Sequence, residues 1–195
     1  MTIANTGDPL QANVFREGGA IAYDDMQGTS AAFKLNGAGS NPDQDDVTIA
    51  GVSFALTGFK VNDEIDRSIQ TFHKMKLSSI LESHIHFITE GADIGGKFKF
   101  QLQVVAAPIG GTFAEVAGSP FTAEKTMESG AETDHGYLDN LANIPGINTT
   151  VSTAYLVKLK RIAAASNEYA GKVYAIFNDE HYMVDSEGSR QEGVK

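Results

Sequence analysis

The strongest constraint on the fold is an alternation of side chains between Lys97 and Ala106. Large apolar residues stand at every second position, and polar residues fill most of the positions between them. A period of two indicates a strand with one face in a core and one face toward solvent, as in antiparallel sheets. The predicted core face carries Phe98, Phe100, Leu102, Val104 and Ala106, and the predicted outer face carries Lys97, Lys99, Gln101 and Gln103.

A second alternation runs from Val151 to Arg161, with Tyr155, Val157 and Leu159 on one face. Shorter β-branched and aromatic runs stand between Gly- or Pro-marked turns, and the last strands are predicted at 173–177 and 181–184. Only residues 134–142 and 162–169 fit short helices. Many short strands without long helices predict an all-β, antiparallel β-sandwich. Periodicity does not distinguish a jelly roll from other sandwiches.

Residues 1–46 differ from the rest of the chain. They are rich in Gly, Asn, Asp, Ala and Ser, with a turn-prone stretch at 36–42 and one aromatic island at Ile21-Ala22-Tyr23, followed by Asp24-Asp25. We expect an extended N-terminal arm over 1–46 and a β-sandwich domain over 47–195.

Charge and composition exclude several classes of function. The net charge is −10, from 25 acidic and 15 basic residues, whereas a nucleic-acid-binding surface needs a basic footprint. The chain has no cysteine, which removes disulfide frameworks and thiol chemistry. No export signal and no apolar run near the roughly 18 residues of a membrane span is evident. We expect a soluble protein made in a cytoplasm.

His84 and His86 are the most suggestive residues for chemistry. At i and i+2 on a strand their imidazoles share one face, and Glu90 follows four residues later. This spacing resembles the first metal motif of the cupins and predicts His84, His86 and Glu90 as metal ligands. Ser78 stands where that motif has glycine, and the second cupin motif is absent. The alternative is a solvated or interfacial histidine pair.

A metal at this motif needs a fourth ligand, which would have to come from His73, His135 or His181. The chain has no Gly-x-Ser-x-Gly elbow and no phosphate-binding Gly-x-x-x-x-Gly-Lys loop. We therefore expect a protein that is not an enzyme and uses no cofactor.

The order of several motifs resembles a family of uncharacterised structural proteins of tailed-phage particles. The motifs are Tyr23-Asp24-Asp25, Phe72-His73-Lys74, Ser83-His84-Ile85-His86-Phe87, Asp179-Glu180-His181-Tyr182-Met183-Val184-Asp185 and Gly188-Ser189-Arg190. The resemblance spans roughly residues 20–192. Phe72 and Phe87 stand where the family has proline and tryptophan.

This resemblance implies a jelly-roll component of a bacteriophage virion. It implies head decoration (a cement protein) or a position at the neck, tail or fibre base. We expect a homo-oligomer, with a trimer favoured, that contacts the major capsid protein or neck and tail proteins and binds neither nucleic acid nor membrane. Tyr23, Asp24 and Asp25 are the candidate partner contacts. The alternatives are a cupin-like metal-dependent enzyme and a glycan-binding jelly roll that uses Tyr155 and Tyr174 for stacking.

Overall fold

A computed structural model describes residues 22–29, 34–35, 40–91, 93–128, 134–146 and 152–184. Those residues contain strands and no helix, so the all-β prediction is confirmed there. The strands are β1 (Ala22–Thr29), β2 (Lys34–Leu35), β3 (Asp43–Ile49), β4 (Val52–Phe59), β5 (Glu64–Gln70), β6 (Leu81–Thr89), β7 (Lys97–Ala107), β8 (Ala114–Glu115), β9 (Phe121–Thr126), β10 (Gly136–Ile144), β11 (Ala154–Ile162) and β12 (Val173–Val184). Within the described residues, no helix is long and apolar enough to cross a membrane.

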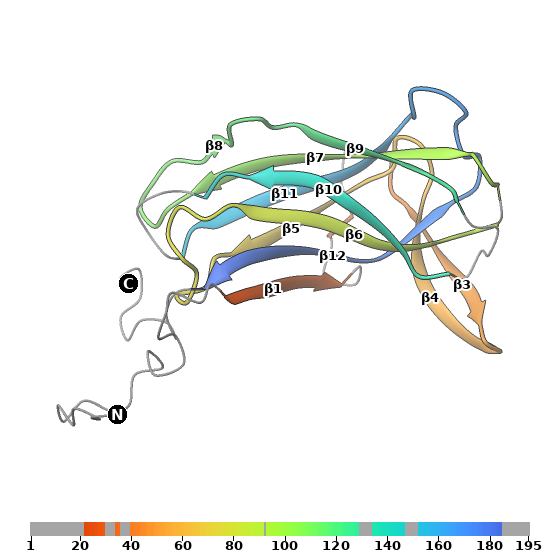
Figure 1. Ribbon diagram of the computed structural model, residues 1–195, viewed down its shortest axis with the longest axis horizontal. Coiled ribbons are helices and arrows are strands. Elements are labelled where there is room, and N and C mark those ends of the chain that lie inside the picture. The colour runs from red at the N-terminus through yellow and green to blue at the C-terminus, as the bar shows by residue number, and fades with distance from the viewer. Residues whose placement is uncertain are drawn as a thin grey trace.

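The strands form two antiparallel sheets that pack face to face (Figure 1). Sheet A has the order β10-β6-β12-β4-β3, and β1 pairs with the second half of β12. Sheet B has the order β2-β5-β11-β7-β8, and β9 pairs with the first half of β7. The pairs β1–β12, β5–β11, β6–β10 and β7–β9 are nested in the chain, which is the pairing of a jelly roll. The predicted antiparallel sandwich is confirmed.

The core lies between the sheets and follows the two long alternations. All five apolar side chains of the predicted core face of β7 are at most 4% exposed. On β11, Tyr155, Val157 and Leu159 are buried in the same way. Burying such faces on both sheets supplies the main favourable free energy of folding, about 25 cal/mol per Å² of apolar surface.

The two segments that fitted helices are not helical. Residues 136–144 form β10, and residues 163–172 after β11 form an irregular connection. In β10, Leu138, Ala142 and Ile144 are buried against β6 and the core. Tertiary packing therefore overrides the weak local preference of this segment.

Two complete strands, β1 and β2, and the start of a third lie within the segment predicted as an arm. β1 pairs with β12 along its whole length, and β3 begins at Asp43, so residue 46 falls inside a strand. β3 is half-exposed and holds its place through backbone pairing with β4, which explains why its acidic sequence reads as a loop. Residues 1–21 of the predicted arm lie outside the described residues.

The β3–β4 hairpin extends away from the body of the sandwich (Figure 1). Only residues 57–59 of β4 pair with β12. Toward the tip, Val52 and Phe54 are 53% and 47% exposed. The hairpin thus presents apolar side chains on a two-stranded ribbon.

β12 joins the two strands predicted at 173–177 and 181–184. Ala175 pairs with Phe87 and Phe177 pairs with His86, so Ile176 is an extra residue, a β-bulge. Val173 and Ala175 lie in the core before this residue, and Tyr182 and Val184 lie in the core after it. His181 consequently lies on the outer face of sheet A.

Candidate functional site

Four of the five histidines of the chain gather on the outer face of sheet A. His84 and His86 are on β6, His135 precedes β10, and His181 is on β12. The ring centroids of His84 and His181 are 4.3 Å apart, those of His84 and His86 are 5.1 Å apart, and those of His86 and His135 are 4.8 Å apart. We call these four residues the histidine cluster.

Strand register brings the cluster together. β12 pairs with β6 so that Asp179 stands opposite His84. Because side chains two residues apart share a face, His86 and His181 lie on the same side of the sheet as that pair. Tyr137 of β10 stands opposite His86, and its ring lies 4.7 Å from that of His84.

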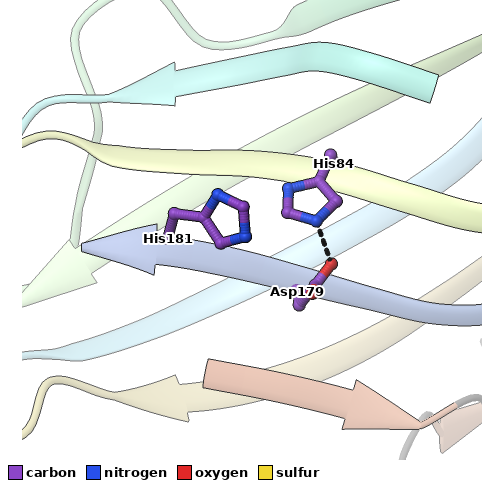
Figure 2. A group of neighbouring side chains, drawn as sticks. All are labelled: His84, Asp179 and His181. Atoms are coloured by element: carbon purple, nitrogen blue, oxygen red, sulfur yellow. Dashed lines mark ion pairs between the residues drawn. The ribbon is translucent and has the colours of Figure 1, made fainter. Parts of the chain in front are cut away.

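His84 and Asp179 form a buried ion pair. Nε2 of His84 is 2.7 Å from Oδ1 of Asp179, and both residues are 2% exposed (Figure 2). Burial alone would lower the pKa of His84, but the hydrogen bond and charge of Asp179 outweigh it, and the pKa is raised. Burial and the neighbouring histidines lower the pKa of His86. The two imidazoles of one predicted pair therefore differ in their preferred protonation state.

His84, Asp179 and His181 could hold a metal ion. Each offers one ligand atom, and these atoms lie within 4.8 Å of one another. Figure 2 shows the three side chains side by side, from β6 and β12. His84 and His181 line a hollow of about 50 Å³ together with Tyr137 and Asp139. Burial and the charge of Asp139 raise the pKa of Tyr137 to about 12, so this phenol stays neutral.

The structure brings together part of the predicted metal set. His84 belongs to the group of three, and Nε2 of His86 is 3.7 Å from Oδ1 of Asp179. Glu90 does not belong to it. Its carboxylate accepts a hydrogen bond from the backbone N–H of Lys172 at 2.8 Å, six residues or about 20 Å along the strand from His84. The carboxylate near the imidazoles comes from the neighbouring strand.

The candidate partner contacts divide into two kinds. Asp24 forms an ion pair with Lys74 and accepts a hydrogen bond from the Tyr182 hydroxyl at 3.3 Å. Oδ1 of Asp25 is 3.1 Å from Nε2 of His181. Both carboxylates thus have partners within the chain. Tyr23 is 57% exposed and remains open to a partner.

Four of the five motifs that carried the family resemblance have residues at this end of sheet A, while Gly188-Ser189-Arg190 lies outside the described residues. The rings of Phe72 and Tyr182 are 5.9 Å apart, and the Lys74 ammonium lies 5.8 Å from the Phe72 ring centre while it pairs with Asp24. On the opposite face of the same two strands, Asp25 pairs with His181 of the histidine cluster. We call the whole set the motif cluster. Its members are Asp24, Asp25, Phe72, Lys74, His84, Asp179, His181 and Tyr182.

The motif cluster has little room for a substrate. Its hollow of about 50 Å³ is far smaller than the roughly 300–1,000 Å³ of pockets that enclose drug-sized ligands. A larger open groove of about 440 Å³ lies on the outer face of sheet B, between Asp66, Gln103 and Leu156. The arrangement at the cluster suits an ion or a proton better than an organic molecule.

The tyrosines predicted to stack on a glycan are not surface platforms. Tyr155 on β11 is 0% exposed in the core. Tyr174 on β12, in the other sheet, is 4% exposed. A Cβ added to Gly58 would come within 2.6 Å of the Tyr174 ring, so this ring packs closely across the glycine of β4. Strand alternation placed both residues correctly on strands but could not show what covers them.

Comparisons with known proteins support no family assignment. No protein-family model and no curated protein matches the chain. Among solved structures, the chain is similar to the CBM36-1 domain of a multidomain xylanase from the hindgut metagenome of Trinervitermes trinervoides, with 8% identity, a TM-score of 0.43, and coverage of 80% of this chain and 96% of that one. It is also similar to a non-crystalline cellulose specific carbohydrate-binding module, CBM28, with 11% identity, a TM-score of 0.27, and coverage of 80% and 95%. Likeness at this level carries no argument about function.

Proposed function

We propose that this protein is a non-enzymatic structural component of a bacteriophage particle, which acts through contacts with copies of itself and with capsid, neck or tail proteins. The observation that carries the proposal is the motif cluster. Motifs that share their order with phage structural proteins are separated by up to about 160 residues in the chain, from Asp24 to Tyr182, yet their side chains contact one another. Such convergence supports one common role for them.

Two ion pairs of the motif cluster connect β1 to neighbouring segments of the sandwich. The Asp24–Lys74 and Asp25–His181 pairs tie β1 and the segment after β5 to the end of β12. These ion pairs hold β1 on the sandwich and leave the side chain of Tyr23 exposed beside them. Exposed tyrosine is among the residues enriched in protein interfaces. We place partner contacts along β1 for this reason.

The β3–β4 hairpin supports self-assembly. A two-stranded ribbon is marginally stable alone, and this one exposes Val52 and Phe54 toward its tip. Packing of the tip against a neighbouring copy would remove this apolar surface from water. A closed ring of identical contacts satisfies every copy, and we favour a trimer by analogy with trimeric decoration and fibre proteins.

The first test is the mass of the full-length protein in solution. We expect light scattering to give three times the chain mass of 20.8 kDa. The double variant Val52→Ser/Phe54→Ser should dissociate while its unfolding free energy per chain stays within about 0.5 kcal/mol, as for exposed positions generally. Ile109→Ser, a change at a 60% exposed turn residue, is the matched control and should stay trimeric. A monomeric wild-type protein at all concentrations would contradict the assembly role.

The second test places the protein in the particle. Antibodies against the purified chain should label intact tailed-phage particles whose genome encodes it, at a fixed position in electron micrographs. Mass spectrometry of the same washed particles should detect the chain. Its absence from particles, with presence in the infected-cell lysate, would refute the virion role.

The groove on sheet B favours a second candidate, a glycan-binding module. Its floor offers the apolar side chain of Leu156, and Ser68, Gln103 and Asp66 surround it with groups that hydrogen-bond sugar hydroxyls. A glycan array should then give a defined ligand, and Gln103→Ala should weaken its binding about tenfold, the effect of one lost hydrogen bond. Uniformly negative arrays would remove this candidate.

A further inference from the structure

We propose that His84, Asp179 and His181 bind one divalent transition-metal ion, of the zinc type, on the outer face of sheet A. This inference rests on the side chains of the site alone and does not depend on a role in a phage particle. It differs from the sequence prediction in two of its three ligands, because Asp179 and His181 replace His86 and Glu90.

The donor set selects the class of metal. Two imidazole nitrogens and one carboxylate oxygen suit zinc, iron, cobalt or nickel, whereas calcium and magnesium prefer oxygen ligands throughout. Three protein ligands leave one position for water or an external ligand, as in exchangeable zinc sites. The hollow of about 50 Å³ that His84 and His181 line has room for that water, which needs about 10–15 Å³.

The geometry is close to a coordination shell. The three donor atoms lie within 4.8 Å of one another, and tetrahedral bonds of about 2.1 Å would bring them to about 3.4 Å. The His84–Asp179 contact of 2.7 Å is already at that scale. Most of the approach therefore falls to His181, whose side chain is 35% exposed.

Neighbouring groups orient these ligands. Asp25 contacts His181 at 3.1 Å, and the backbone of Glu82 hydrogen-bonds His84. A metal-bound histidine commonly gives its other ring nitrogen to a carboxylate or a carbonyl group. The hollow is also lined by Glu82 and Asp139, whose charges favour a cation over an anion. Positioning and charge thus favour the same occupant.

The competing explanation is a closed histidine–aspartate ion pair with stacked imidazoles. That arrangement would neutralise the buried Asp179 without a metal. The two explanations differ in one measurable property. A metal site binds one ion per chain and gains stability from it, while a closed pair is indifferent to added metal.

The experiment uses the full chain, stripped of metal by a chelator and then titrated with Zn²⁺. We expect one Zn²⁺ per chain by calorimetry and elemental analysis. At a hundredfold excess over Kd, the melting temperature should rise by about 5–10 °C. Co²⁺ in place of Zn²⁺ should give the visible absorption of a four- or five-coordinate ion. The absence of stoichiometric binding would overturn the proposal.

Matched variants locate the ion. His181→Gln is the main test because its side chain is partly exposed, so the fold should survive, and affinity for Zn²⁺ should fall at least a hundredfold. Asp179→Asn keeps the size of a buried ligand and should have a similar effect. His73→Gln, which alters the one histidine outside the cluster, should bind like the wild type.

One further variant separates the neighbouring histidine pair. Nδ1 of His86 lies 2.7 Å from Nε2 of His135, so these residues could also attract an ion. His135→Gln should retain Zn²⁺ binding. Loss of binding in His135→Gln with retention in His181→Gln would place the ion at the other pair and refute the assignment.

Discussion

Two consecutive acids of β12 lie on opposite faces of the same sheet and have different partners. Glu180 points between the sheets and pairs with Arg67 of β5, while Asp179 points outward and pairs with His84 of β6. All four residues are at most 5% exposed. The difference between the pairs therefore arises from the partner and its surroundings, since burial is nearly the same.

The inner pair is enclosed by hydrogen bonds. Arg67 also donates to the carbonyl oxygen of Asn178 at 2.8 Å, and the Ser83 hydroxyl donates to Glu180 at 3.3 Å. Burial raises the pKa of Glu180 to about 7, and Arg67 acts against this rise. A cation that never loses its proton, in closed surroundings, links sheet B to sheet A. This pair has a structural role.

The outer pair has a cation that can lose its proton, next to other imidazoles and a hollow. An ion can replace that proton, whereas nothing can replace the Arg67 guanidinium. The comparison teaches that a buried acid becomes a candidate for function when its partner is exchangeable. The following predictions test this difference, beginning with the largest effect.

Removal of Arg67 should have the largest effect on stability. Arg67→Met leaves Glu180 buried without its cation, and we expect a loss of about 3–5 kcal/mol in the free energy of unfolding. Urea denaturation measures it. The double variant Arg67→Met/Glu180→Met should recover most of the loss because no buried charge remains. A loss below 1 kcal/mol in the single variant would show that the inner pair does not hold the sheets together.

Asp179→Asn should cost less than Arg67→Met. The amide keeps the shape of the side chain but loses a charged hydrogen bond, worth about 1.5–3 kcal/mol. Urea denaturation of the metal-free protein at pH 6 is the measurement. A cost equal to that of Arg67→Met would remove the proposed distinction between the two faces.

Ser83→Ala should weaken the inner pair without uncovering it. The Ser83 hydroxyl donates to Glu180 and accepts from the Asn178 amide at 2.9 Å. Loss of both bonds should cost about 1–2 kcal/mol. Zn²⁺ affinity should stay unchanged, since Ser83 faces the core. A changed affinity would mean that the two faces are coupled.

The outer pair should make stability depend on pH. The pKa of His84 is raised above its ordinary value of 6.5, so the pair contributes stability that is fully present below pH 6.5 and is lost as pH rises through the folded-state pKa. The stability difference between wild type and Asp179→Asn should therefore be larger at pH 5.5 than at pH 9. An NMR titration of the His84 ring checks the cause. A difference that grows with pH would contradict the sign.

Asp25→Asn should have the smallest effect on the metal-free protein. The Asp25–His181 pair is partly exposed, and such pairs contribute about 0–1 kcal/mol. Thermal unfolding with and without Zn²⁺ separates its structural role from its orienting role. A cost above 2 kcal/mol without metal would show that β1 depends on this contact.

Local pattern was sufficient to predict the core strands. The alternation in β7 and β11 predicted which side chains are buried, because one face of each strand meets the opposite sheet. The same alternation puts Arg67 on the face of Ile65 and Ile69, inside the sandwich. A charged residue there is not expected without its partner, and Glu180 comes 113 residues later.

The sequence predicted only part of the candidate site, because its residues come from strands that are far apart in the chain. The spacing of His84 and His86 indicated a shared face, and His181 was one of three histidines considered as a further ligand. Asp179 appears in the sequence analysis only within the motif Asp179-Glu180-His181, with no sign that it would lie beside His84. Its place opposite His84 depends on the register of β12 against β6, which no local pattern encodes.

The extra residue in β12, Ile176, changes which residues of the strand face the core. Before Ile176 the odd-numbered residues face the core, and after it the even-numbered residues do. If residues 173–184 ran as a regular strand with Ile176 paired like its neighbours, Asp179 and His181 would point inward while Tyr182 pointed to solvent. The bulge therefore decides the side on which every later side chain acts, and deletion of Ile176 itself would leave Asp179 and His181 on the outer face because the ladder would then be regular.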